Sequence, residues 1–160
     1  MSTAPRILLI DDDKNLRAVL AFALKEKGFS VATAAEGAEG LERIAADPPN
    51  VVLCDLKMPG MDGLALLEAL RDRGDDTPVL VITAFGSIDS AVEATRRGVF
   101  DYLEKPVSPE RLKAVVERGL EHTNMRREIL RLRREMARSG RLDELVGRSP
   151  AMLQIYRLVD

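Results

Sequence analysis

The sequence predicts an α/β protein with a doubly wound, five-stranded parallel sheet, and three observations support this prediction. Up to about residue 108, short apolar runs alternate with amphipathic segments. Two of the runs, VVLC and VLVI, are apolar throughout, as expected for strands buried on both faces. Glycines follow three of the amphipathic segments, at the position just past a helix end. Right-handed crossovers then place any ligand site at the carboxyl ends of the strands.

Each expected strand is a short aliphatic or β-branched run. The strands are RILLI (6–10), SVATA (30–34), VVLCD (51–55), PVLVIT (78–83) and DYLEK (101–105). The helices between them are expected over 14–27, 37–46, 64–73 and 87–97, and a fifth begins near 109. The glycines expected to end three of these helices are Gly28, Gly74 and Gly98. In the MPGMDG loop, Pro59 and Gly60 favour a tight turn, and Gly63 is expected to adopt backbone geometry that other residues resist. This loop should leave Asp55 exposed.

Composition and charge indicate a soluble globular protein. The chain has 160 residues, 46% of them hydrophobic and 31% charged, which suffices for one domain and an appendage. Its net charge of −2 predicts no overall attraction to nucleic acid or anionic membranes. The N-terminal MSTAPR lacks the apolar core of a signal peptide, and no apolar run could span a bilayer. The single cysteine, Cys54, is interpreted as a small buried hydrophobe, and we expect a cytoplasmic protein.

Polar side chains follow the predicted strands at the edge where their carboxyl ends meet. Asp11 and Asp12 follow the first strand, and Asp55 ends the third. Thr83 ends the fourth strand, and Lys105 ends the fifth. Converging carboxylates need a cation, and oxygen ligands suit Mg²⁺. A carboxylate nucleophile, a hard metal, a lysine and a hydroxyl are the groups that accept a phosphoryl group, so the sequence predicts such a site here.

Each residue taken singly also has a simpler interpretation. Asp13 is expected to be a first-turn helix acid, favoured by the helix dipole. Asp55 alone could be a turn residue, Thr83 an ordinary strand residue and Lys105 plain surface. Their joint placement at the strand ends is what favours a site. His122 is the only histidine, which excludes a histidine metal cluster and leaves a seam or surface position.

Four blocks of the sequence resemble the signature motifs of bacterial response-regulator receiver domains. They are LLIDDD, LCDLKMPGMDG, VITA and FDYLEKP, and the resemblance covers about residues 5–122. It implies a flavodoxin-like receiver domain over residues 1–122, with strand order 2-1-3-4-5. It also implies that Asp55 accepts a phosphoryl group from a sensor histidine kinase.

The same resemblance implies a role for each residue of the site. The implied Mg²⁺ ligands are Asp12, Asp55 and the backbone carbonyl of Lys57 directly, and Asp11 through water. The groups implied to contact phosphoryl oxygens are Thr83, the backbone N–H of Ala84, and Lys105. Tyr102 would change rotamer when Thr83 moves, and a cis peptide bond would precede Pro106.

The last residues resemble a narrower group. ELVGRSPAMLQIYRLV is similar to the opening of the AAA+ ATPase domain in NtrC-type activators of sigma-54 RNA polymerase, and MPGMDGLALL and FDYLEKP are typical of the same group. Residues 139–160 are therefore expected to be a linker and the start of a truncated ATPase domain. Sigma-54 RNA polymerase and DNA would be contacted by parts missing from this chain. No G-x-x-x-x-G-K-[ST] loop occurs, so we expect no enzyme activity beyond the domain's own phosphorylation and dephosphorylation.

One long basic helix is predicted over 109–138, continuing the fifth helix into a dimerising coiled coil. From Arg111 to Arg141 there are ten Lys or Arg residues and four acids. A seven-residue repeat, imperfect at Arg118 and His122, predicts the seam of a homodimer. The seam residues are Val115, His122, Met125, Ile129, Leu132 and Met136. A single amphipathic helix lying on its own domain remains an alternative, whereas the interspersed glutamates disfavour DNA contact.

Two other functions remain open. The first is a haloacid-dehalogenase-type, Mg²⁺-dependent phosphatase, which also uses an aspartate on a doubly wound fold. Asp11 and Asp13 fit the D-x-D-x-[TV] motif of that family, but Asn15 stands at its last position and Asp55 would have no role. The second is a pseudo-receiver that binds partners without phosphorylation, and the complete acidic set argues against it.

Overall fold

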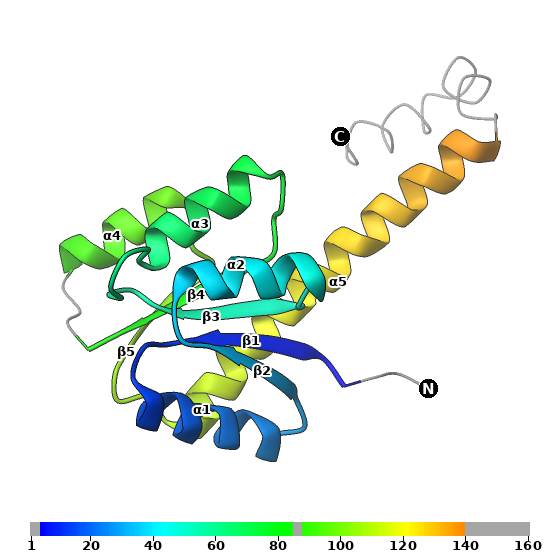
Figure 1. Cartoon of the computed structure of the whole chain (residues 1–160). Helices are drawn as coiled ribbons and strands as arrows, with labels where there is room; N and C mark the ends of the chain where they lie inside the picture. Colours follow the sequence, from blue (N-terminus) through cyan, green and yellow to red (C-terminus); the bar gives the residue numbers. More distant parts are fainter. Residues whose placement is uncertain (1–3, 85–87, 140–160) are drawn as a thin grey trace. The chain divides into compact units, whose positions relative to one another are not determined.

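The observed architecture is the predicted α/β fold. We describe the protein from a computed structural model, which describes residues 4–84 and 88–139, with only the backbone given for Ile88, Ser90 and Ser139. Five parallel strands form one sheet in the order β2-β1-β3-β4-β5 (Figure 1). The fold class and the strand order predicted from the sequence are therefore confirmed.

Strands and helices alternate along the chain. The strands are β1 (Arg6–Ile10), β2 (Ser30–Ala34), β3 (Val51–Asp55), β4 (Val79–Thr83) and β5 (Asp101–Glu104). The helices are α1 (Lys14–Glu26), α2 (Gly37–Ala46), α3 (Gly63–Asp72), α4 (Ile88–Arg97) and α5 (Pro109–Ser139). Each element lies where the sequence predicted it, with ends that shift by about one residue, which is the usual uncertainty of helix and strand ends.

Each face of the sheet has its own hydrophobic core because side chains alternate between the faces along a strand. Leu8 and Ile10 of β1 point to the face covered by α2, α3 and α4. Ile7 and Leu9 point to the opposite face, which α1 and α5 cover. Every residue of β3 and β4 is buried, as expected for central strands. Cys54 is part of the first core, and burial raises the pKa of its thiol, so it is a small buried hydrophobe, as predicted.

The glycines that follow α1, α3 and α4 end these helices as predicted. All three have positive φ angles; they are Gly28, Gly74 and Gly98. After α1, the Phe29 N–H donates to the Leu24 carbonyl at 3.2 Å, and the Gly28 N–H donates to the Lys25 carbonyl at 3.0 Å. This pattern is the Schellman motif, which satisfies the last carbonyls of a helix and requires a left-handed residue.

The chain divides into two compact units, Met1–Thr123 and Asn124–Asp160. The first contains the sheet and the part of α5 that packs on it. There the Thr123 hydroxyl donates to the Asn50 carbonyl at 3.0 Å. In the second unit the described residues, 124–139, are helical throughout. The predicted linker and ATPase start from residue 140 onward lie outside the described residues.

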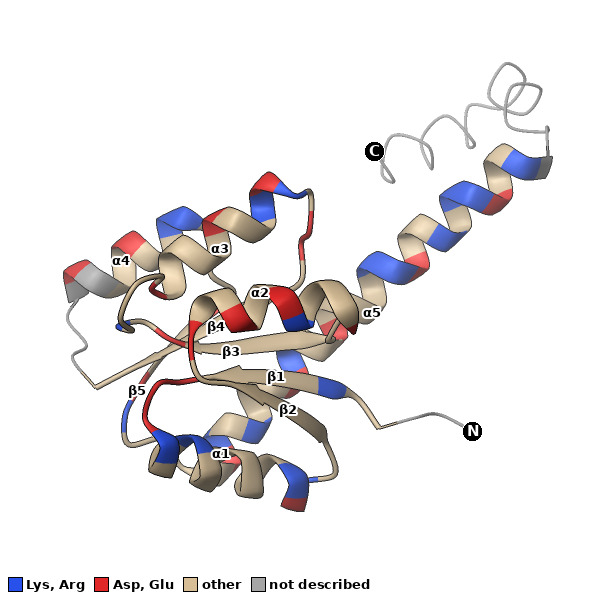
Figure 2. Ribbon diagram, viewed as in Figure 1, with Lys and Arg blue, Asp and Glu red and all other residues tan. Residues whose placement is uncertain are grey.

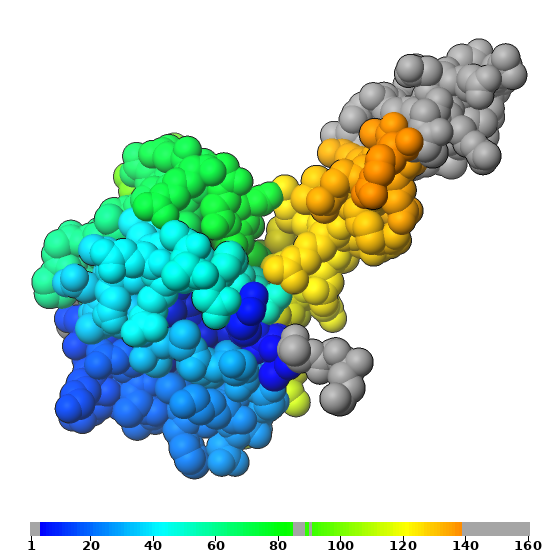
Figure 3. Space-filling view, turned by 45° about the vertical axis from the view of Figure 1, so that its right-hand side comes forward, coloured from blue at the N-terminus to red at the C-terminus, as the bar shows by residue number. Residues whose placement is uncertain are grey.

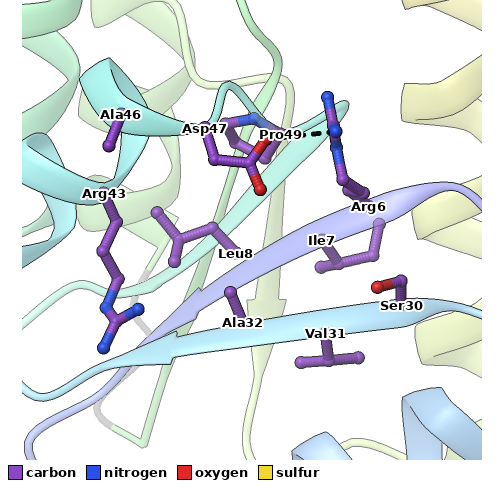
Figure 4. A pocket seen from close by; sticks show the side chains of 10 residues that line it. All are labelled: Arg6, Ile7, Leu8, Ser30, Val31, Ala32, Arg43, Ala46, Asp47 and Pro49. Carbon is purple, nitrogen blue, oxygen red and sulfur yellow. Dashed lines mark ion pairs between the residues drawn. The ribbon is translucent and has the colours of Figure 1, made fainter.

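A hollow on the surface of the first unit is remote from the acidic strand ends. Figure 3 shows the atoms of α2, in cyan, and of α3, in green, on the surface of this unit. The hollow, of about 170 Å³, lies where β1 and β2 begin, and Arg6 and Arg43 line it (Figure 4). Arg6 pairs with Asp47 at 3.1 Å, and Arg43 with Glu39 at 3.7 Å, so both guanidinium groups already have an acidic partner. Within the described part of the chain, no helix combines the length and apolarity that crossing a membrane requires.

Candidate functional site

The acidic residues that follow β1 and end β3 converge at one edge of the sheet. Ile10 pairs with Cys54 in the sheet, so Asp11 and Asp55 come one residue later on neighbouring strands. Carboxylate oxygens of Asp11, Asp12 and Asp55 all lie within 4.8 Å of one another. Figure 2 shows the acidic loop after β1 at this edge. Three oxygen ligands so close together fit a hard divalent cation such as Mg²⁺.

Lys105 brings a positive charge to this cluster from the segment after β5. Its Nζ lies 3.0 Å from Asp55 Oδ2 and 3.5 Å from Asp11 Oδ2. Burial opposes the charge on the ammonium, but the hydrogen bond to Asp55 and the negative charge of Asp11 outweigh it, so the pKa of Lys105 is raised. The Lys105–Pro106 peptide bond is cis, as the family resemblance implied.

Asp11 is the most deeply buried acid of the site, with 1% of its surface exposed. Its Oδ1 accepts the Asp13 N–H at 2.9 Å, and its own N–H donates to the Ala34 carbonyl at 3.1 Å. Burial raises the pKa of this carboxyl, although the Asp13 N–H and Lys105 partly offset the effect. The ionised form of Asp11 is therefore short of positive charge, which a bound cation would supply.

Asp55 is also largely buried, so the expectation that its loop would leave it exposed was wrong. Only 8% of its surface is exposed. The reason is its place at the end of a central strand, with Lys105 on one carboxylate oxygen and the Lys57 N–H donating to the other at 3.2 Å. Asp55 is thus held in a defined orientation rather than displayed on a turn.

The turn after Asp55 depends on two glycines for different reasons. Gly60 has a φ angle of +78°, as a tight turn requires. Gly63 has no positive φ, and it is needed instead because a Cβ there would lie 2.9 Å from the Asp55 carbonyl oxygen. Its N–H donates to the Leu56 carbonyl at 3.1 Å. The close approach of α3 to the end of β3 thus explains Gly63, rather than the unusual dihedral angles that we expected.

Asp13 is the N-cap of α1 and stands just before the first turn in which the sequence placed it. Its Oδ1 accepts the N–H groups of Asn15 at 3.0 Å and Leu16 at 3.1 Å. A carboxylate at this position accepts hydrogen bonds from otherwise unpaired backbone N–H groups, and the positive end of the helix dipole stabilises its charge. Asp13 is absent from the group formed by the other three acids, so its role is in the helix start.

The three residues implied to respond to a phosphoryl group lie on β4 and β5 and just after β4. Thr83, 1% exposed, is the last residue of β4 and pairs with Glu104. Tyr102 pairs with Val81 in the same ladder and packs, partly buried, against the core under α3 and α4. Ala84 follows Thr83 and is exposed. Asp55 pairs with Ile82, so Thr83 lies just beyond Asp55 on the neighbouring strand.

One residue of the predicted dimer seam is buried in the domain core, whereas the apolar seam residues in the second half of α5 are exposed or partly exposed. Val115 is 1% exposed and belongs to the core between α5 and the sheet, so its place in the seam was wrong. His122 is exposed, and its ring lies 5.4 Å from that of Phe100. Met125 is 65% exposed and Ile129 41% exposed. The other two seam residues are Leu132, exposed, and Met136, partly exposed.

The chain belongs to the response regulator receiver domain family, whose model matches residues 7–117. The parallel five-stranded sheet with its acidic carboxyl edge is what this membership leads one to expect. The match covers β1 from Ile7 onward, the other four strands and the first turns of α5.

Individual relatives are NtrC-type regulators. The chain is 38% identical to the DNA-binding transcriptional regulator NtrC of Escherichia coli (strain K12), over 96% of this chain and 32% of that protein. The receiver domain of NtrX from Brucella abortus is 38% identical, with a TM-score of 0.68, over 72% of this chain and 98% of that one. NtrX from Brucella abortus in complex with ADP is 36% identical, with a TM-score of 0.76, over 97% of this chain and 33% of that one. The chain thus spans about a third of the length of the curated relatives that it matches.

Proposed function

We propose that this protein is a phosphorylation-dependent switch of a two-component system, in which Asp55 accepts a phosphoryl group from a sensor histidine kinase. One observation carries the proposal. The Asp55 carboxylate ends a central strand, bonded at 3.0 Å to the Lys105 ammonium and grouped with two further acids. A nucleophile, a countercharge and a cation site therefore occur within one cluster.

In the proposed reaction, a carboxylate oxygen of Asp55 attacks the phosphorus in line with the leaving group. The new O–P bond forms as the P–N bond of the kinase phosphohistidine breaks, and the imidazole nitrogen keeps the electron pair. Lys105 offsets the charge of the phosphoryl oxygens, and Thr83 and the Ala84 N–H donate to them. Asp11, Asp12, Asp55 and the Lys57 carbonyl would hold Mg²⁺, which supplies further positive charge when bound.

The phosphatase alternative requires a second aspartate at the site, and the structure gives that aspartate another role. Asp13, which the D-x-D motif would require at the site, caps α1 through two backbone N–H groups. The pseudo-receiver alternative would leave a buried acid, Asp11, and a cluster of three carboxylates without a task. Both points support phosphorylation of Asp55.

The wider function follows from the NtrC-type relatives and is part of the same proposal. Residues 1–122 would be the receiver, 109–138 a helix that pairs two copies, and 139–160 the start of an AAA+ ATPase. Parts absent from this chain would then contact sigma-54 RNA polymerase and DNA. The protein would act in the cytoplasm and would catalyse only its own phosphorylation and dephosphorylation.

The test is incubation of the purified chain with acetyl phosphate and Mg²⁺, followed by intact-mass measurement. The wild-type protein should gain one phosphoryl mass, and Asp55→Asn should gain none. Asp13→Asn is the matched control, because it removes a neighbouring carboxylate but keeps a good N-cap. It should be labelled like the wild type. Full labelling of Asp55→Asn would refute the proposal.

A further inference from the structure

The carbonyl of Asp11 has a partner that the sequence analysis did not single out. Arg17, in the first turns of α1, donates from Nη1 to the Asp11 backbone oxygen at 2.7 Å. The Arg17 side chain is partly buried, and its backbone N–H donates to the Asp13 carbonyl at 2.9 Å. A short charge-assisted bond of this kind is stronger than a neutral one. Spacing alone could not reveal it, because a long side chain can leave its helix in several directions.

The Asp11 carbonyl belongs to the peptide unit that joins Asp11 to Asp12. These two residues supply two of the three carboxylates of the site. Asp11 is fixed by further contacts on its N–H and its Oδ1, but the Asp12 side chain is exposed. The orientation of Asp12 therefore depends on that of the peptide before it, and Arg17 holds the oxygen of this peptide.

We infer that Arg17 is a positioning residue for the cation site, and that it fixes the Asp11–Asp12 peptide so that both carboxylates face Asp55. This inference rests on the proposed function, because it assigns Arg17 to the proposed Mg²⁺ site. Arg17 acts through the backbone and does not itself contact the phosphoryl group. Its positive charge alone would weaken binding of a cation. Charge and position therefore predict opposite effects when Arg17 is removed.

The variants are chosen to separate these effects. Arg17→Met keeps an unbranched apolar stem but removes the charge and the donor. Arg17→Lys keeps a charge and one donor of similar reach. Arg71→Met is the matched control, because Arg71 of α3 donates to the carbonyls of Asp75 at 2.8 Å and Thr77 at 3.2 Å. Arg71 thus also holds backbone carbonyls through its guanidinium group, but these carbonyls belong to residues outside the acidic cluster.

The measurement is Mg²⁺ affinity, from amide NMR shifts during titration of each full-length variant, together with its midpoint of thermal unfolding. Arg17→Met should bind Mg²⁺ about tenfold more weakly, the usual scale for loss of an outer-shell partner. Arg17→Lys should bind nearly as tightly as the wild type. Arg71→Met should unfold at lower temperature but keep wild-type affinity.

Four results would overturn the inference. Tighter Mg²⁺ binding by Arg17→Met than by the wild type would show that only the charge of Arg17 matters. Weakening in Arg71→Met equal to that in Arg17→Met would show general loosening of the fold. Wild-type Mg²⁺ affinity in Arg17→Met, together with normal labelling of Asp55, would reject the positioning role of Arg17 but leave the proposed function standing. Absence of Mg²⁺ binding by the wild type would reject the proposed metal site, and the inference with it.

Discussion

At the scale of single residues, the site holds carboxylates that are close together and partly buried, and both conditions oppose their ionisation. Asp11 lies almost wholly out of water beside two other carboxylates, and Lys105 is shared between Asp11 and Asp55. One ammonium stands against three acids, and the pKa of Asp11 is raised, chiefly by burial and to a smaller extent by the charge of Asp55. Such sites are arranged for a ligand rather than for stability of the free protein.

This opposition to ionisation gives a prediction for Asp11→Asn in the absence of Mg²⁺. Because the pKa of Asp11 is raised on folding, the folded protein binds a proton more tightly than the unfolded chain, and stability from this group falls as pH rises. Asparagine cannot ionise, so the variant should unfold a few degrees higher than the wild type at pH 7. The gap should narrow as the pH approaches the unfolded pKa of Asp11.

Thermal unfolding between pH 4 and pH 8, with and without Mg²⁺, checks this prediction. Bound ligand stabilises the folded state, so added Mg²⁺ should raise the unfolding midpoint of the wild type more than that of Asp11→Asn. A variant that unfolds below the wild type at pH 7 without metal would show that the hydrogen bonds of Asp11 outweigh its desolvation.

At the scale of elements, the order and bounds of strands and helices could be predicted from the sequence. Apolar runs, amphipathic segments and the glycines after helices all act locally, so they define each element without knowledge of the rest. The grouping of Asp11, Asp55 and Lys105 could be predicted as well, because parallel strands end at a common edge. The chain fixes these features by topology rather than by side-chain detail.

The features that could not be predicted from the sequence depend on side-chain conformation and packing. The burial of Asp55 depends on its central strand and on the long Lys105 side chain that reaches its carboxylate. The bond from Arg17 to the Asp11 carbonyl depends on where another long side chain turns. Val115 was misplaced for another reason. Over a few turns, the 3.5-residue repeat of a coiled coil and the 3.6-residue repeat of a packed helix coincide, so a core residue also fits a seam.

We expect signal transmission to involve strands β4 and β5 together with α4. Phosphorylation adds charge and acceptor oxygens at Asp55, and Thr83 lies just beyond it on β4. We expect Thr83 to move toward the phosphoryl group and Tyr102 to follow, as a two-state element. Thr83→Ala should therefore be phosphorylated but lose the NMR shift changes in α4 and β5.

Thr83→Ser is the matched control, since it keeps the hydroxyl and should keep the shift changes. The NMR spectra of both variants would be compared before and after phosphorylation. Identical changes in the wild type and in Thr83→Ala would exclude this route of transmission.

At the scale of the whole molecule, the second half of α5 exposes an apolar stripe within a basic segment. Residues 124–139 contain six arginines and two glutamates. Arg131 is paired within the helix, with Glu135 at 2.8 Å and Glu128 at 2.5 Å. Exposed apolar side chains gain about 25 cal/mol per Å² when they are buried against a partner. A two-fold dimer of this helix is the simplest way to bury them.

Ile129→Asp should therefore convert a dimer into a monomer, since it places two acids in the centre of the seam. Truncation after residue 122 should do the same. Val19→Asp is a matched control, because Val19 of α1 is 63% exposed and lies outside the seam. Dimerisation of the wild type should strengthen with salt, because salt screens repulsion between the arginines. Light scattering that finds a monomer at micromolar concentration would contradict this account.

The central claim is that a phosphoryl group is carried on Asp55 as an acyl phosphate, and one measurement tests it most directly. The protein is phosphorylated with acetyl phosphate and Mg²⁺ and then treated with borohydride, which reduces an aspartyl phosphate to homoserine. Peptide mass spectrometry locates the change. Our account predicts homoserine at position 55, with Asp11, Asp12 and Asp13 unchanged. Homoserine at one of those three positions, or none in a protein that has gained phosphoryl mass, would contradict it.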